Sequence, residues 1–284
     1  TRRSSDLSAR HALVLFCSLV LQPANPNNTD VTNQASSDLT AIDQRITKTP
    51  YTDSLCFESY AMTLTQTLQH HLDAPGELLI WTSVDPAHEQ DFNQWYDREH
   101  MQERAAIKGF RWSRRYHSDT CARPYLALYQ TDTLHVFTSE PYRQAFTKQT
   151  QWSERNFTRM RDTSRRVNAV TPLAGAGTGA AVALVCLESN EQAQAAIALA
   201  QELTHVMDGV LALRALCPDP VLSTPLPAED LTTRKLEPFI VIETTSQASA
   251  ASAGQWLAEK LGLPSARSHC FKLLWDLQSL DLAR

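Results

Sequence analysis

The chain has 284 residues, of which 43% are hydrophobic and 20% are charged, and its formal net charge at pH 7 is −5. This length allows one large domain or two ordinary ones, and the acidic balance argues against a nucleic-acid-binding protein. The basic residues are unevenly distributed, because 12 of the 14 in residues 77–172 are Arg. Arg is suited to bidentate binding of carboxylates, although an ion-paired surface would have the same composition.

Residues 1–75 differ from the rest of the chain. A short apolar run at 12–21 follows a basic start, which is the outline of a signal peptide, and it is too short to span a bilayer. The polar residues after it predict disorder. A second interpretation places the native start at Met62, so that residues 1–61 would not belong to the native protein. We favour this interpretation and expect a cytoplasmic protein without a membrane partner, whereas a genuine signal peptide would mean export.

The six cysteines are scattered along the chain. They form no CxxC pair and no Cys/His ligand spacing, so we predict reduced thiols and no zinc site. The stretch GAGTG at 175–179 precedes a predicted strand, whereas a phosphate-binding glycine loop precedes a helix. We therefore expect neither a metal nor a cofactor.

From residue 76 onward, strand-like and helix-like runs alternate. The first six predicted elements have the order βαββαβ, and Asp85-Pro86 is a typical helix opening. These elements are a strand at 77–85, a helix at 90–106, strands at 110–118 and 123–131, a helix at 139–148 and a strand within 157–170.

A small-residue linker at 172–179 leads to a second series with the same order. Its predicted elements are a strand at 180–188, a helix at 191–206, strands at 209–217 and 237–245, a helix at 248–262 and a strand at 268–277. We predict three regions, which are a disordered or artefactual segment at 1–75, a first unit at 76–172 and a second, degenerate unit at 173–284.

The predicted fold class is α+β, with two tandem βαββαβ ferredoxin-like units that form an intramolecular α+β barrel. One such unit makes a four-stranded antiparallel sheet with helices on one face. The uncovered face needs a partner, and two units in one chain can supply it to each other. We expect a cavity between the two sheets.

The stretch DFNQWYDREHMQER at 91–104 carries the strongest signal for a site. Helix positions three or four apart share a face. One such stripe begins with aromatic residues and ends with ionisable ones, and it comprises Phe92, Trp95, Tyr96, Glu99, His100 and Glu103. Either the helix reaches solvent at its C-terminal end, or the stripe ends in a polar site.

The run DPxHExxFNxWYDxEHxxER, followed by GF, RRYH and PYLALY, resembles the dimeric α+β barrel superfamily and most closely its EthD-like branch. The resemblance covers 77–170, and the second half matches only in element order. It implies one site per chain, with His100 facing a cavity. The superfamily includes monooxygenases, isomerases, cyclases and haem-binding proteins as well as proteins without known activity, so the fold does not decide the function.

The residues of this helix and of the strand at 110–118 suggest acid–base chemistry. His100 is the predicted proton carrier, because imidazole titrates near neutral pH. One face of the strand carries Arg114 and the other carries Arg115, and either could bind an anionic group. The predicted substrate-binding residues are Trp95, Tyr96, Glu99, Glu103, Arg104, Arg114 and Tyr116. For Glu103 and Arg104 the alternative is a purely structural contact that closes the helix.

Three functions are compatible with these residues. The first is a cofactor-independent enzyme that acts on a small aromatic or carbonyl-bearing, possibly anionic compound by isomerisation, cyclisation or lactone chemistry. The second is a non-catalytic binding or structural barrel in which His100 is a satisfied structural residue. The third is a haem-binding or monooxygenase-type barrel. In each case we expect a small-molecule ligand, no nucleic acid, and either a monomer or a homodimer.

Overall fold

The computed structural model describes residues 71–226 and 229–283. The apolar run at 12–21, the alternative start at Met62 and the disorder expected before residue 71 lie outside this part of the chain. Among the described residues, no helix is long and apolar enough to cross a membrane.

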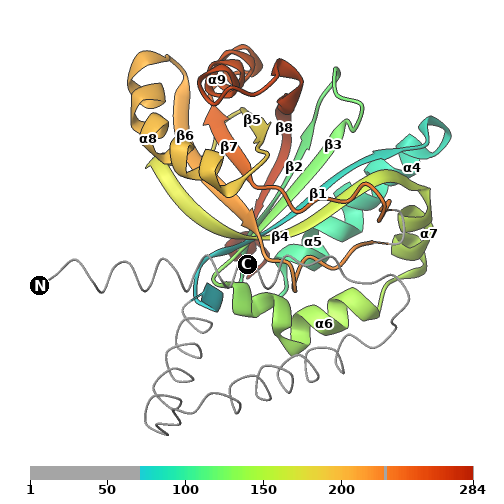
Figure 1. The fold of residues 1–284 in the computed structure, drawn as a ribbon. Coiled ribbons are helices and arrows are strands. Elements are labelled where there is room, and N and C mark those ends of the chain that lie inside the picture. The colour runs from blue at the N-terminus through green and yellow to red at the C-terminus, as the bar shows by residue number, and fades with distance from the viewer. Residues whose placement is uncertain (1–70, 227–228, 284) are drawn as a thin grey trace, which may run out of the picture. The chain divides into compact units, whose positions relative to one another are not determined.

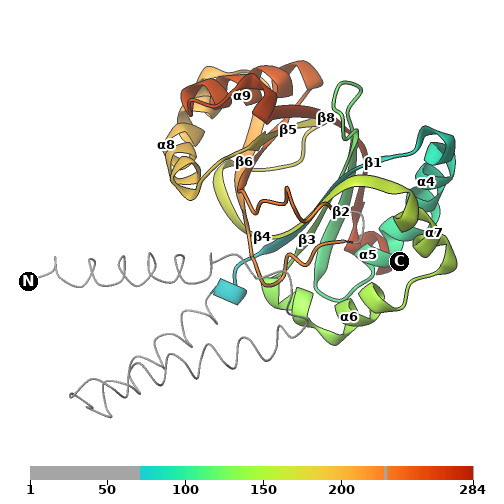
Figure 2. The same ribbon diagram turned by 45° about the vertical axis from the view of Figure 1, so that its right-hand side comes forward.

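The eight strands of the described part form one closed antiparallel barrel (Figures 1 and 2). Neighbouring strands follow the order β1-β3-β2-β8-β5-β7-β6-β4, and the circle closes between β4 and β1. The first four strands are therefore adjacent in the order 4-1-3-2, and the last four are adjacent in the order 8-5-7-6. The two sets join through β2–β8 and β4–β6 pairing. The protein is thus a mixed α+β fold built on a closed eight-stranded barrel.

The elements up to residue 175 include more helical segments than the sequence predicted. They are β1 (Gly76–Val84), η1 (Pro86–His88), α4 (Glu89–Trp95), η2 (Tyr96–His100), α5 (Met101–Ala105), β2 (Phe110–His117), β3 (Tyr125–Thr131), η3 (Leu134–Thr138), α6 (Glu140–Thr147), α7 (Gln151–Arg159) and β4 (Met160–Gly175). The predicted helix at 90–106 is interrupted by the π-helical turn η2. Helix α7 was not predicted, although Thr150 caps its first turn by accepting from the Ser153 backbone N–H.

The remaining elements follow the predicted order closely. They are β5 (Ala181–Cys186), α8 (Asn190–Val206), β6 (Val210–Pro218), β7 (Phe239–Thr244), α9 (Gln247–Lys260), η4 (Ser265–Arg267), β8 (Ser268–Gln278) and η5 (Ser279–Ala283). The predicted linker at 172–179 is wrong in its first half, because β4 continues to Gly175 and pairs there with β6.

Three packed layers explain why most strands are apolar on both faces. The inside of the barrel holds one cluster drawn from both sets of strands, including Leu79, Leu128, Leu184 and Phe271. The other two clusters lie outside the barrel, where α4–α7 cover the first four strands and α8 and α9 cover the last four. A strand covered on both sides becomes a nearly continuous apolar run, as β1, β5 and β7 are.

Buried ion pairs also fill part of the barrel interior. The Arg214 guanidinium donates to Glu77 at 2.9 Å and to Glu243 at 2.8 Å. Arg114 donates to Asp276 at 3.1 Å and lies 3.6 Å from Glu243. Glu77 and Glu243 are fully buried. We expected a cavity between the sheets, but apolar side chains and these pairs occupy the interior, and the pocket described below lies outside the barrel.

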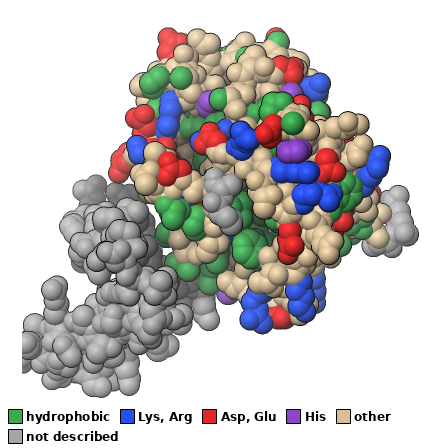
Figure 3. All heavy atoms as spheres, turned by 90° about the vertical axis from the view of Figure 1, so that its right-hand side faces the viewer, with side chains coloured by type: hydrophobic (Ala, Val, Ile, Leu, Met, Phe, Trp, Pro, Cys, Tyr) green, Lys and Arg blue, Asp and Glu red, His purple; other side chains and the backbone are tan. Residues whose placement is uncertain are grey.

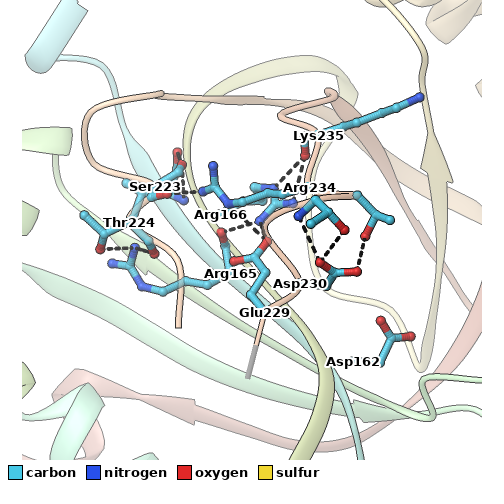
Figure 4. A network of polar contacts seen from close by, with 12 residues as sticks. Asp162, Arg165, Arg166, Ser223, Thr224, Glu229, Asp230, Arg234 and Lys235 are labelled. Atoms are coloured by element: carbon cyan, nitrogen blue, oxygen red, sulfur yellow. Dashed lines mark hydrogen bonds and ion pairs between the residues drawn. The ribbon is translucent and has the colours of Figure 1, made fainter. Parts of the chain in front are cut away.

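The long connection between β6 and β7 lies along β4 and is fixed to it by arginines (Figure 4). Arg165 donates to the backbone oxygens of Leu222 and Thr224, each at 2.9 Å. Arg166 and Arg234 both approach the Glu229 carboxylate. These contacts provide acceptors for the buried guanidinium groups of Arg165 and Arg166.

Candidate functional site

Strand β2 separates the predicted site residues into two groups. Arg114 and Tyr116 point into the barrel, where Tyr116 belongs to the interior cluster. His100, Trp95 and Tyr96 lie on the opposite face, in the layer between the helices and the sheet. The structure therefore does not bring Arg114 and Tyr116 to the helix residues with which they were grouped.

The strand does not alternate along its whole length as the sequence suggested. A register shift between Phe110 and Trp112 places Phe110 in the helix-side cluster and Trp112 in the interior cluster. Beyond this bulge the alternation holds, so Arg115 faces the helices and Arg114 faces the interior.

His100 is enclosed by aromatic rings. It is 6% exposed, and its ring centroid lies 4.2 Å from that of Trp95 and 5.2 Å from that of Tyr96. The rings of Tyr129 and Phe157 follow at 6.3 and 5.9 Å. Its Nδ1 has no hydrogen-bond partner among the described residues. The stripe therefore does not reach solvent at His100, and the imidazole is not fully satisfied either.

Other predicted residues of the helix bind the segment that contains α6 and α7. Glu99 accepts a hydrogen bond from the Thr150 hydroxyl at 2.6 Å, and the Trp95 indole N–H donates to Ser153 at 3.0 Å. Arg104 donates to the Ala145 backbone oxygen at 3.1 Å. These contacts join two helical segments across the surface of the sheet. The geometry thus gives Glu99 and Arg104 structural partners rather than a place beside the pocket.

A pocket of about 700 Å³ opens on the outer face of β2 and β8. Its lining residues are Asn93, Asp97, Arg115, His117, Tyr125, Leu274 and Trp275. None of the eight predicted site residues lines it. The pocket has a polar side, formed by α4, η2, β2 and β3, and an apolar side, formed by β8.

Arg115 forms the inner end of the polar side. It is 2% exposed and lies over the rings of Tyr96 and Tyr125, with its Cζ 4.3 and 5.0 Å from their centroids. One terminal nitrogen donates to Asp97 at 3.3 Å and the other donates to the Asn93 side-chain oxygen. Its Nε–H has no acceptor among the described residues. A buried guanidinium held by one exposed carboxylate can still bind an anionic oxygen.

Four buried polar atoms without partners in the described part of the chain lie on this same side of β2 and β3. They are Arg115 Nε, the Ser113 and Tyr129 hydroxyl oxygens, and His100 Nδ1. Ser113 and Tyr129 are register partners in the β2–β3 pairing. Buried polar groups are nearly always bonded in proteins, so each exception needs an explanation. Since the Arg115 N–H can only donate, its missing partner is an acceptor.

The charges near this cluster fix the protonation of its members. Burial, with the positive charges of Arg104 and Arg115, holds the pKa of His100 well below its ordinary value, so the imidazole is neutral near pH 7. Burial raises the pKa of Tyr129 well above its ordinary value, the neighbouring Tyr96 hydroxyl acts in the same direction, and the Tyr129 phenol stays protonated. The cluster therefore combines a cation, a phenol donor and a neutral imidazole.

Tyr125 links the pocket to helix α4. Its hydroxyl donates to Glu89 at 2.7 Å and accepts from the Asn93 amide at 3.2 Å. Burial, followed by the neighbouring Glu89, raises the pKa of Tyr125 to about 12. Unlike Tyr129, this phenol is fully bonded.

Sequence reasoning missed most of the lining residues. Arg115 and His117 had been placed on one face of the strand at 110–118, but no pattern selected that face. Asn93 and Asp97 are one turn apart on the helix, beside the aromatic stripe, and this spacing was the signal available. Leu274 and Trp275 come from the last strand, so only the barrel closure brings them here.

Most of the other arginines of the region 77–172 take part in ion pairs at the surface. Examples are Arg111 with Asp132 at 2.8 Å and Arg161 with Asp85 at 2.6 Å. Figure 3, which looks onto the side that carries α4 and α7, shows basic and acidic side chains close together over much of that face. The Arg-rich composition therefore reflects an ion-paired surface in large part, and Arg115 belongs to a buried minority with Arg104, Arg114, Arg165 and Arg166.

Metal binding has no support in the part of the chain that the structure describes. No group of three or more His, Cys, Asp or Glu side chains is arranged there to hold a metal ion. The four cysteines described, Cys121, Cys186, Cys217 and Cys270, are free thiols.

Comparison with known proteins gives similarity at the level of structure only. No protein-family model matches the chain, and no curated protein matches it. An anthrone oxidase-like protein aligns with 73% of this chain and 94% of its own, at 9% identity and a TM-score of 0.48. A chlorite dismutase mutant from Candidatus Nitrospira defluvii aligns with 70% and 90%, at 11% identity and 0.41. A heme-binding protein from Thermus thermophilus aligns with 75% and 94%, at 10% identity and 0.39.

Proposed function

We propose that the protein is a cofactor-independent enzyme that transfers a proton on a small compound with an aromatic or apolar body and an anionic or carbonyl oxygen. One observation carries this proposal. Four buried polar atoms without partners among the described residues lie behind a pocket whose inner end is the Arg115 guanidinium. A ligand oxygen would supply the acceptor that the Arg115 N–H lacks.

Each residue has a role in this proposal. Arg115 binds the oxygen, and the Tyr129 phenol donates a second hydrogen bond as negative charge develops on it. The neutral His100 takes the proton from the adjacent carbon and returns it to another position. Trp275 and Leu274 contact the apolar body. Trp95 and Tyr96 hold His100 in place rather than touch the ligand, and the π-helical turn η2 directs His100 toward β3.

The test uses aryl ketones and lactones that carry a carboxylate as probes. We expect NMR to show deuterium exchange from D₂O into the carbon beside the carbonyl with the wild type. Arg115→Met should reduce binding of these probes by about tenfold or more, which is the loss of one charge-assisted contact. Arg111→Met is the matched control on the same strand, because its exposed pair with Asp132 lies away from the pocket. Equal binding by both variants would contradict the proposal.

A non-catalytic binding barrel would use the same pocket. In that case the probes would bind through Arg115 without any deuterium exchange, and His100→Phe would leave binding unchanged. The exchange experiment therefore separates catalysis from binding alone.

A haem-type barrel is a second candidate, favoured by one observation. His117 is the imidazole that lines the pocket, and haem iron needs such a ligand. His117 would hold the iron and Arg115 would face a carboxylate of the macrocycle. The His117 Nδ1 already lies 3.3 Å from Asp119, which would orient the ring. Titration with hemin tests this candidate, because a Soret band that shifts on binding and is lost in His117→Ala would support it.

We also infer that the barrel consists of two tandem copies of one βαββαβ unit. The repeated strand order supports this, and so do equivalent residues in the two sets. Gly109 and Gly209 precede β2 and β6 with φ of +94° and +80°, a conformation that favours glycine. Arg114 and Arg214 lie five residues after them and share Glu243. Membership of the EthD-like branch remains a proposal that rests on the motif at 85–104.

A further inference from the structure

A cysteine and a histidine from distant parts of the chain meet away from the pocket. Cys121 lies in the turn between β2 and β3, and His269 lies in β8. The Cys121 Sγ is 3.6 Å from His269 Nδ1. Both side chains are partly exposed, so a small molecule can reach them.

The surroundings hold this pair in place. The Trp81 ring meets the His269 ring edge-on at 4.7 Å, and its indole N–H donates to the Arg123 backbone oxygen at 2.8 Å. That hydrogen bond fixes the turn that carries Cys121. The Arg123 guanidinium lies over the Trp81 ring, 4.9 Å from its centroid, and donates twice to the Asp162 carboxylate, at 2.7 and 2.9 Å.

Asp162 has a left-handed backbone, with φ of +49°. Such a conformation is uncommon for residues other than glycine, and strained residues concentrate at functional sites. Here it directs the carboxylate at Arg123, and Arg123 in turn contacts the ring that holds His269.

The electrostatic environment favours a neutral imidazole beside a thiol. Burial, with the charges of Arg123 and Arg267, lowers the pKa of His269. Burial raises the pKa of Cys121, while the Arg123 backbone, the Trp81 indole and the Arg123 charge act in the opposite direction. The other titratable groups nearby are Asp162, Glu237 and the buried Cys186. A neutral imidazole can remove the thiol proton as the sulfur reacts.

We propose that Cys121 and His269 form a nucleophilic thiol site for α,β-unsaturated carbonyl compounds, independent of the pocket at Arg115. The sulfur forms a bond to the β-carbon, and the electron pair of the C=C bond moves to give an enolate. His269 Nδ1 takes the thiol proton and then delivers it to the α-carbon. The product is a thioether, and no group leaves. The Arg123 cation lies nearby to stabilise the enolate oxygen.

The test measures the rate at which N-ethylmaleimide modifies each thiol of the full chain, by peptide mass spectrometry at pH 7. We expect Cys121 to react at least about tenfold faster than Cys270, which has similar exposure and donates only to the Gln247 backbone oxygen at 3.3 Å. His269→Gln should reduce the Cys121 rate to that of Cys270 and leave the Cys270 rate unchanged.

Two results would overturn the proposal. One is a Cys121 rate no faster than that of Cys270, and the other is an unchanged Cys121 rate in His269→Gln. The pH profile of the wild type is a second measurement that needs no variant. Assistance by the imidazole predicts a Cys121 rate that persists below pH 7, whereas a simple buried thiol reacts only as pH approaches its raised pKa.

Discussion

Arg114 and Arg115 are neighbours in one strand, and they lie in opposite environments. Arg114 points into the barrel, where it donates to Asp276 and lies beside Glu243. Arg115 points toward the helices, where its carboxylate partner, Asp97, is exposed and its Nε–H has no acceptor among the described residues. Both side chains are buried, but only the first is fully matched by charge.

The same difference extends to the residues around them. Inside the barrel, the charged groups come from five strands of both sets and are paired with one another. On the helix side, the Ser113, Tyr129 and His100 atoms lack partners within the described part of the chain. Complete pairing is what a structural network requires. The Tyr116 hydroxyl also lacks a partner inside the barrel, so the two sides differ in the pairing of their charged groups, and the unpaired atoms beside the pocket are the ones that the proposed ligand would reach.

The largest effect should come from breaking the interior network. Arg214→Met leaves Glu77 and Glu243, both fully buried, without their main counter-charge. We expect the free energy of unfolding to fall by about 3–5 kcal/mol, the cost of an unpaired buried charge. Urea unfolding measures this loss, with Arg111→Met as an exposed control that should change little. A loss below about 1 kcal/mol would mean that the network is not structural.

The pH dependence of stability should report the buried His100. Its pKa is lowered in the folded state, so below about pH 6.5 the unfolded chain takes up a proton that the folded chain does not. The free energy of unfolding should therefore decrease as pH falls below this value. His100→Phe should remove up to about 1.4 kcal/mol per pH unit of this slope.

The contribution of His100 is read from the difference in pH dependence between the wild type and His100→Phe, because other histidines also contribute to the pH dependence of each protein. The lowered pKa of His269 acts in the same direction, and the raised pKa of His71, bonded to Asp219, acts in the opposite one. Both groups remain in His100→Phe. If the unfolding free energy of both proteins changes equally with pH, His100 takes up its proton in the folded chain as readily as in the unfolded chain, and its pKa is not lowered.

Two tyrosines of β3 provide a smaller and sharper comparison. The Tyr125 hydroxyl donates to Glu89 and accepts from Asn93, whereas the Tyr129 hydroxyl has the Tyr96 hydroxyl nearby but no hydrogen bond of good geometry among the residues described. We expect Tyr125→Phe to cost about 1–2 kcal/mol of unfolding free energy and Tyr129→Phe to cost less than about 0.5 kcal/mol. Thermal or urea unfolding of both variants measures these two losses of unfolding free energy. Equal losses would mean that Tyr129 has a bonding partner after all.

The element order was predictable because it follows from local patterns. Apolar runs, helix caps such as Asp85-Pro86, and glycines such as Gly109 mark where strands and helices begin and end. The π-helical turn and α7 were not predicted. A π-turn has no clear sequence signal, and α7 is strongly polar, so its short pattern was hidden between α6 and β4.

The site was predictable only in part. The aromatic stripe predicted a helix packed against the sheet, and in the structure Trp95 and Tyr96 enclose the buried His100, whose role in a site stays a prediction. The position of the pocket depends on β8, which lies more than 150 residues away from β2 in sequence. The face of β2 that meets the helix depends on the bulge after Phe110. Both are consequences of barrel closure, which no local pattern encodes.

The free energy of unfolding of His100→Phe, measured at pH 7 beside the wild type, tests the central claim most directly. The aromatic enclosure suits a phenyl ring, and the substitution removes a buried Nδ1 that has no partner among the described residues. We predict equal or higher stability, as expected where a polar residue is kept for function. His100→Leu guards against an effect of ring size. A loss above about 2 kcal/mol in both variants would show that His100 is bonded and structural, and would contradict the account.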